Sequence, residues 1–158
     1  MSPLRLSSAY LQLAQALSEL SLVCVPSASQ LNLSGCHLGG YYEDESWRDS
    51  DGYDTVGNEN RFFADPEGVQ AIADALRVNG SLTSINLSSN NLTNYGKDMT
   101  GITELAAALT VNGTLTSIDL SRNNLCGVNW RGKGIYTSVG MTAIADALRA
   151  NASLTEVP

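Results

Sequence analysis

Two stretches of the chain are near copies of one another. Residues 68–92 read GVQAIADALRVNGSLTSINLSSNNL, and residues 101–125 read GITELAAALTVNGTLTSIDLSRNNL. They align without a gap, and the first part of the unit returns as GMTAIADALRANASLTEVP at 140–158. Such self-similarity predicts a solenoid, in which each unit buries its apolar side against its neighbours.

The first half of each unit has the period of a helix. Its apolar residues follow the i, i+3, i+4, i+7 spacing of one helical face. The stripes are Val69, Ile72, Ala73 and Leu76, then Ile102, Leu105, Ala106 and Leu109, and finally Met141, Ile144, Ala145 and Leu148. The pairs Asn79-Gly80, Asn112-Gly113 and Asn151-Ala152 follow the helices, and they predict left-handed helix caps.

The second half of the unit reads LxxLxLxxNxL. Its apolar residues alternate as in a short strand and are Leu82, Ile85, Leu87 and Leu92, with Leu115, Ile118, Leu120 and Leu125 as the copy. Asn90 and Asn123 lie where the chain turns out of the strand. An amide side chain both donates and accepts, so it can satisfy buried backbone groups there. Stacked units are therefore expected to form an asparagine ladder.

This pattern resembles leucine-rich repeats of the ribonuclease-inhibitor type, which also occur in NOD-like receptors and the Ran GTPase-activating protein. The resemblance is strong over 68–158 and weaker over 10–38, where Leu31-x-Leu33-x-x-Cys36-x-Leu38 is similar to a strand and turn. Cys36 takes the ladder position, where that family accepts Cys as well as Asn. The resemblance implies an α/β solenoid: a short right-handed horseshoe segment with parallel strands on the concave face and helices outside.

Extra residues separate the ladder turn of each unit from the next helix. They predict three insertions on one rim, at 39–66, 93–100 and 126–139. We expect a single domain over 1–158, with an atypical N-terminal helix and first repeat in 1–38. Regular repeats would occupy 68–158, the last of them truncated.

The insertion at 39–66 is acidic and aromatic. Within 39–67 there are nine acidic residues and two arginines, and this difference of −7 equals the net charge of the whole chain. Acidic disordered segments are poor in aromatic residues. Here the rings are expected either to pin the insertion onto the solenoid or to bind a partner, as Tyr and Trp often do. They are Tyr41, Tyr42, Trp47, Tyr53, Phe62 and Phe63.

The insertion at 126–139 contains GVNWRGKG, which is close to a phosphate-binding P-loop. Gly134 stands where that loop needs a Ser or Thr for magnesium, so nucleotide binding is not expected. Trp130, Arg131, Lys133 and Tyr136 instead predict a basic-aromatic contact patch for a partner, with a solvated loop as the alternative.

Other chemistry has little support in the sequence. Reading Gly52 as the sixth EF-hand position puts Trp47 and Asn58 where carboxylates are required, which excludes an EF-hand; an irregular calcium site remains an alternative. His37 is the only histidine, so no catalytic triad, zinc site or other cofactor is expected. A pI near 4.5 argues against nucleic-acid binding.

The cysteines and the N-terminal segment indicate where in the cell the protein is located. Cys24, Cys36 and Cys126 are odd in number and form no CxxC pair, which favours a reducing environment. Polar residues interrupt the leucine-rich N-terminal segment, so neither a secretion signal nor a membrane span is expected. The sequence predicts an intracellular protein, soluble or peripheral to a complex.

The expected concave face is small and polar and offers few interface anchors. Partner binding is therefore predicted at the rim insertions and at the C-terminal edge, where Leu154 and Val157 begin a strand that has no polar cap. The predicted function is a protein–protein interaction module without enzymatic activity, serving as an accessory or scaffold subunit of a larger assembly. The alternatives are a regulator of a partner enzyme, of the inhibitor or GTPase-activating type, and a calcium-dependent binder acting through the acidic insertion.

Overall fold

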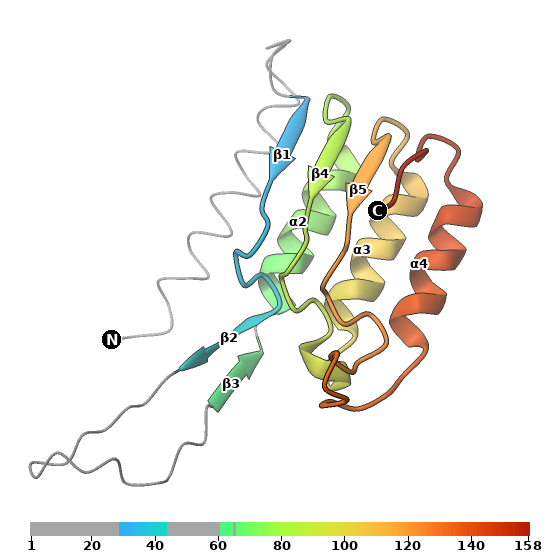
Figure 1. Cartoon of the computed structure of the whole chain (residues 1–158). Coiled ribbons are helices and arrows are strands. Elements are labelled where there is room, and N and C mark those ends of the chain that lie inside the picture. Colours follow the sequence, from blue (N-terminus) through green and yellow to red (C-terminus); the bar gives the residue numbers. More distant parts are fainter. Residues whose placement is uncertain (1–28, 44–60, 65) are drawn as a thin grey trace, which may run out of the picture.

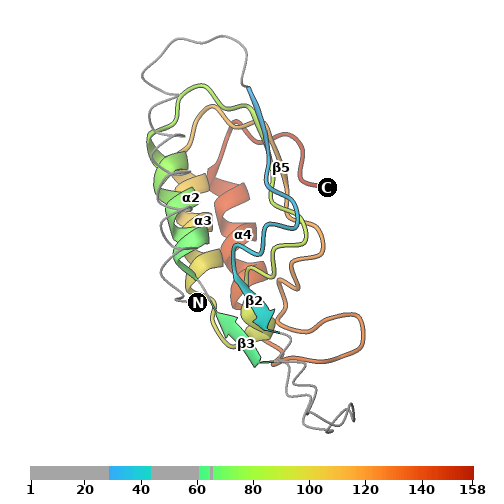
Figure 2. The ribbon, with the colours of Figure 1, turned by 90° about the vertical axis from the view of Figure 1, so that its left-hand side faces the viewer.

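The computed structural model describes residues 29–43, 61–64 and 66–158, so the expectations for Trp47, Tyr53 and the N-terminal helix fall outside it. One sheet is parallel and has the strand order β1 (Gln30–Asn32), β4 (Ser84–Asn86), β5 (Ser117–Asp119). Helices α2 (Pro66–Val78), α3 (Thr100–Val111) and α4 (Val139–Ala150) lie side by side on one face of this sheet (Figure 1, Figure 2). The predicted alternation of helices with parallel strands is confirmed.

Two smaller elements lie in the predicted insertions. Strands β2 (Gly40–Glu43) and β3 (Arg61–Ala64) form an antiparallel hairpin. The short 3-10 helix η1 (Asn94–Gly96) lies between β4 and α3. Both are at the same end of the parallel strands in Figure 1.

Helix α2 shows why the repeated unit begins as a helix. Pro66 fixes the backbone at the first position, where its missing N–H has no partner to lose. Glu67 in the first turn and Arg77 in the last turn complement the helix dipole. The helix buries the stripe that contains Ile72 and Leu76.

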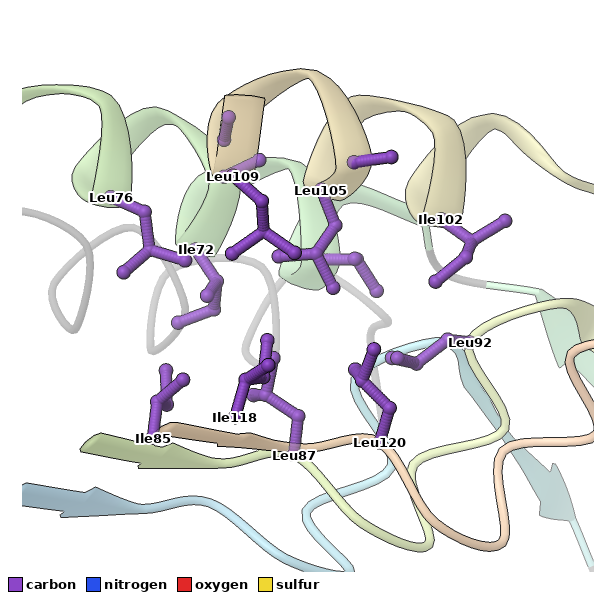
Figure 3. Packing of buried hydrophobic residues seen from close by; sticks show 14 of the residues in the cluster. Ile72, Leu76, Ile85, Leu87, Leu92, Ile102, Leu105, Leu109, Ile118 and Leu120 are labelled. Atoms are coloured by element: carbon purple, nitrogen blue, oxygen red, sulfur yellow. The ribbon is translucent and has the colours of Figure 1, made fainter. Parts of the chain in front are cut away.

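The core lies between the helices and the sheet. Figure 3 shows leucine and isoleucine side chains of α2 and α3 pointing toward those of the strand segments. Leu105, Leu109 and Ile118 are fully buried there. The strands are in register, with Ile85 opposite both Leu31 and Ile118, so equivalent residues of successive units stack on one another.

The asparagine ladder connects the turns that follow the strands. Asn123 Nδ2 donates to the backbone oxygens of Leu87 and Leu120, at 2.7 and 3.0 Å. Asn90 Nδ2 donates in the same way to Leu33 and Leu87, at 2.8 and 3.0 Å. Both asparagines are buried. Each side chain therefore bonds its own turn and the turn of the preceding unit.

The residues on either side of each ladder position have a left-handed backbone. This pattern recurs in three turns at equivalent places, which indicates a shared turn geometry. The pairs are Gly35 and His37 (φ 67° and 57°), Ser89 and Asn91 (59° and 53°), and Arg122 and Asn124 (58° and 51°).

Cys36 does not behave as the sequence predicts. The expectation of a buried ladder residue is wrong, because Cys36 is exposed and its Sγ lies 3.9 Å from the backbone oxygen of Ser34. A thiol is a weak donor and acceptor and cannot replace an amide in the ladder. Asn90 Oδ1 instead accepts from the backbone N–H of Leu38, at 3.2 Å.

The predicted left-handed helix caps are also wrong. Asn112 (φ −75°, ψ 122°) and Asn151 (φ −82°, ψ 129°) have an extended backbone, and neither Gly80 nor Gly113 has a positive φ. The chain leaves each helix directly for the next strand. The asparagine side chain, rather than a left-handed residue, supplies the hydrogen bonds of this turn.

These asparagines form a second ladder, which the sequence reading missed. Asn112 Oδ1 accepts from the backbone N–H groups of Thr114 and Leu115, at 3.0 and 2.8 Å. Its Nδ2 donates to the oxygen of Leu76 in the preceding unit, at 2.7 Å. Asn151 repeats this arrangement one unit later, with Leu109 as the acceptor at 2.6 Å.

The last unit is only half covered. Its chain continues the sheet through a parallel bridge between Ser117 and Glu156. In α4, Ile144 is buried, but Met141 is 53% exposed and Ala145 is also exposed. The apolar stripe of α4 is therefore only partly buried, because no further unit of the described chain packs on it.

Within the described residues, no helix combines the length and the apolar character needed to cross a bilayer.

Candidate functional site

Polar side chains on the solvent face of the parallel sheet form hydrogen bonds with the backbone of the chain itself. Thr83 and Thr116 donate through Oγ1 to the backbone oxygens of Ser29 and Thr83, both at 3.0 Å. Asn86 and Asp119 accept from backbone N–H groups two residues ahead, at 2.9 and 2.8 Å. These hydrogen bonds link neighbouring units and shape the turns. The residues that the sequence predicts for the concave face are Gln30, Asn32, Thr83, Ser84, Asn86, Ser88, Thr116, Ser117, Asp119, Ser121, Arg122 and Glu156.

Residues 126–139, here called the rim loop, have an ordered tip. Asn129 Oδ1 accepts from the backbone N–H groups of Arg131 and Lys133, at 2.9 and 3.0 Å. Its backbone N–H donates to the oxygen of Lys133 and its backbone oxygen accepts from Gly132, both at 2.9 Å. One asparagine therefore closes the turn that carries Trp130 and Arg131.

The base of the rim loop is packed against the loop of the preceding insertion. Gly96, Gly127 and Gly134 all have positive φ, and a Cβ on Gly96 or Gly127 would collide with the backbone oxygen of Ile135. The N–H of Ile135 donates to the oxygen of Tyr95, at 2.8 Å. Only glycine allows this approach of two backbones. The rim loop is thus anchored to the solenoid.

The rim loop presents its aromatic and basic side chains to solvent. Trp130 is 86% exposed and Tyr136 is 74% exposed. The guanidinium carbon of Arg131 lies 4.4 Å from the centroid of the Trp130 ring, a cation–π arrangement. Lys133 is also exposed. The structure therefore brings the predicted Trp130, Arg131 and Lys133 together on one ordered turn, with Tyr136 farther along the loop.

The aromatic residues of the acidic insertion are placed by their backbone. In the β2–β3 hairpin, Tyr41 is opposite Phe63 and Tyr42 is opposite Phe62. The hairpin begins where the N–H of Gly39 donates to the oxygen of Asn90, at 3.0 Å. The rest of this predicted site lies outside the described residues.

The C-terminal face of the solenoid contains an apolar pocket. We use the name C-terminal face for the residues that line this pocket, which belong to α4, the turn after β5 and the segment at Val157 and Pro158. The pocket has a volume of about 420 Å³ and includes Arg122 as a charged lining residue. Its apolar lining comes from Leu120, Leu125, Met141, Ile144, Ala145, Leu148 and Val157.

Exposed large apolar side chains gather at the rim loop and the C-terminal face. Eight such side chains occur in the described part, and six of them belong to these two regions. They are Trp130, Ile135, Tyr136, Val139, Met141 and Val157; the other two are Val78 and Val111. Sequence reading missed Ile135, Val139 and Met141 as surface residues. It also missed the role of Asn129, although an Asn placed before a Gly-rich tip is a known turn signal.

One repeated unit of the chain matches a known protein family. Residues 81–103 match the family model described as Leucine Rich Repeat. The match covers the strand β4, the ladder residue Asn90 and the start of α3. The helices and parallel strands of the structure fit the α/β fold of leucine-rich repeats, and a leucine-rich repeat is a binding module in the general sense.

Among solved structures, a chain described as Leiomodin-1 Actin-Binding Site 2 (ABS2) aligns with this chain at 22% sequence identity and a TM-score of 0.47. The alignment covers 94% of this chain and 76% of that one. No curated protein matches the sequence significantly.

Proposed function

We propose that this chain is a protein–protein interaction module that has no enzymatic activity of its own. It serves as an accessory or scaffold subunit of a larger assembly inside the cell. It binds through the rim insertions and the C-terminal face rather than through the solvent face of the sheet. The leucine-rich repeat at 81–103 supports protein binding in general, and the specific role is our inference.

One observation carries this proposal. Six of the eight exposed large apolar side chains of the described part lie on the rim loop and the C-terminal face. Isolated exposed apolar residues are ordinary, whereas clustered ones mark interaction sites. Trp130 and Tyr136 are also of the residue types that contribute most to interfaces.

The fold proposed for the whole chain is a short right-handed horseshoe segment of the ribonuclease-inhibitor type. The three insertions at 39–66, 93–100 and 126–139 would then share one rim. The odd number of cysteines and the absence of a CxxC pair in the sequence support an intracellular location, since disulfide frameworks are typical of oxidising compartments.

Affinity capture with crosslinking and mass spectrometry tests the proposal. The tagged chain is recovered from native lysate beside two variants, Trp130→Ala and Met141→Asp, which alter the rim loop and the C-terminal face. We expect a stoichiometric partner with the wild-type chain, crosslinked near one of these regions. At least one of the two variants should lose this partner.

Val111→Asp is the matched control, because Val111 is 66% exposed at the end of α3 and belongs neither to the rim loop nor to the residues that line the C-terminal pocket. It should retain the partner. Recovery of a lone monomer, or equal recovery with all variants, would contradict the proposed function.

A further inference from the structure

We propose that the tip of the rim loop is a docking site for an acidic segment of a protein partner. This inference rests on the proposed function and adds the chemistry of the partner. The segment would place carboxylates on Arg131 and Lys133 and an apolar side chain on Trp130.

The charge of the tip is uncompensated. Arg131 and Lys133 are both exposed, and 126–139 contains no acidic residue. Neither side chain has an ion-pair partner among the residues that the structure describes, whereas Arg77 and Arg149 do. Because the net charge of −7 resides within 39–67, the remainder of the chain is neutral, and the tip is a local positive exception.

The contact between Arg131 and Trp130 suits a carboxylate. A guanidinium placed over an aromatic ring keeps its in-plane N–H groups available, and these match the two oxygens of a carboxylate. The 4.4 Å contact therefore positions a donor fork beside an apolar ring. Lys133 supplies a second, exposed cation on the same turn.

The order of the tip favours binding. Asn129 closes the turn with four hydrogen bonds of 2.9–3.0 Å, and the glycines at its base hold the loop against Tyr95 and Ile135. A partner would not have to order this backbone when it binds, so less binding energy is lost. A solvated connecting loop has no need of such anchoring.

The net charge of the chain favours a protein partner over nucleic acids and anionic membranes. Both are extended arrays of phosphate, which the seven excess negative charges of the chain repel as a whole. A short acidic segment carries far fewer charges than such an array, so the net charge of the chain repels it less. We therefore assign the tip to a protein segment.

The experiment uses a phage-displayed library of random twelve-residue peptides, selected on the folded full-length chain. We expect the enriched peptides to be acidic and to contain an aromatic or aliphatic residue. Arg131→Glu combined with Lys133→Glu should weaken the best peptide roughly tenfold or more, since it replaces two attractions with repulsions. Raising the salt concentration should weaken it as well.

Two further variants serve as a charge control and as a means of assigning the Trp130 signal. Arg149→Glu also reverses an exposed cation, on α4, and should bind the peptide as the wild type does. Trp130→Phe identifies the indole N–H resonance of Trp130, which should shift when the peptide is added. Circular dichroism checks that each variant is folded.

Any of three outcomes overturns the inference: no enriched peptides, enriched peptides without acidic residues, or equal binding to the double variant. Binding of phosphatidylserine vesicles that depends on Arg131 and Lys133, without acidic peptide binding, would assign the tip to a membrane surface instead. Partner capture that survives the double variant would leave the proposed function standing and refute this inference alone.

Discussion

The backbone N–H of Asn90 donates a 2.7 Å hydrogen bond to Oδ1 of Asn123, 33 residues further along the chain. The Nδ2 group of Asn123 bonds two backbone oxygens, one in its own turn and one in the preceding turn. A single buried side chain therefore holds two units of the solenoid together. The stability of the fold should depend more on this residue than on polar residues of the same size outside the two ladders.

Asn123→Ala should destabilise the protein by about 3 kcal/mol, because it leaves buried backbone donors and acceptors without partners. Asn86→Ala is the control: Asn86 is half-buried and its side chain accepts from the backbone N–H of Ser88, so about 1 kcal/mol is expected. Urea denaturation measures both. Equal losses would show that the ladder has no special weight.

Gly134→Ala should disrupt the rim loop. Gly134 has a φ of 128°, and a Cβ there would collide with the backbone oxygen of Gly127. Gly132 also has a positive φ, 73°, but a Cβ there meets nothing within 4 Å, so Gly132→Ala should cost only about 1–2 kcal/mol of local strain. Hydrogen exchange at the amide of Ile135, which bonds Tyr95, reports the difference. Fast exchange in both variants, or in neither, would contradict this view of the loop base.

Leu109→Ala should cost about 3–4 kcal/mol, because Leu109 is fully buried between the helices and the sheet. Leu148 lines the pocket of the C-terminal face and is half-buried, so Leu148→Ala should cost about 1 kcal/mol. The midpoint of chemical denaturation measures each loss. A large loss at Leu148 for the isolated chain would mean that this face is covered in solution.

Arg77 connects α2 to α3 through a 2.6 Å ion pair with Glu104, and it also bonds Asp74. Arg77→Met should cost at most about 1 kcal/mol at low salt and less in 1 M NaCl, because both partners are partly exposed. Arg149→Met, which breaks the more exposed pair with Asp146, should have no measurable effect.

The direction of the pKa shift of Arg77 determines how the stability contributed by this ion pair changes with pH. Hydrogen bonding to Glu104 raises the pKa of Arg77, an effect that burial partly offsets. A group with a raised pKa stabilises the fold below its unfolded pKa, and this stabilisation is lost only as the pH rises through the folded value. Both values lie far above neutrality, so the cost of Arg77→Met should stay constant between pH 7 and about 10. A decline over this range would contradict the assignment.

The binding surfaces were only partly predictable from the sequence. Trp130, Arg131 and Lys133 were identified as a patch because aromatic and basic residues alternate in a Gly-rich insertion. The anchoring of that patch was not predictable, since Gly96 and Ile135 belong to different insertions and meet only when the units stack. The exposure of Met141 was missed for a related reason: a helical stripe shows which face is apolar, and only packing shows whether a neighbour covers it.

The sequence by itself determined the repeat, the alternation of helix and strand, and the buried face of each inner unit. These follow from the spacing of apolar residues, which is a local property of the chain. Tertiary structure decided which polar groups bond across units. It selected Asn112 and Asn151 for a second ladder and left Cys36 exposed. The reason is physical: a hydrogen bond depends on the distance and angle between stacked backbones, and no single unit contains them.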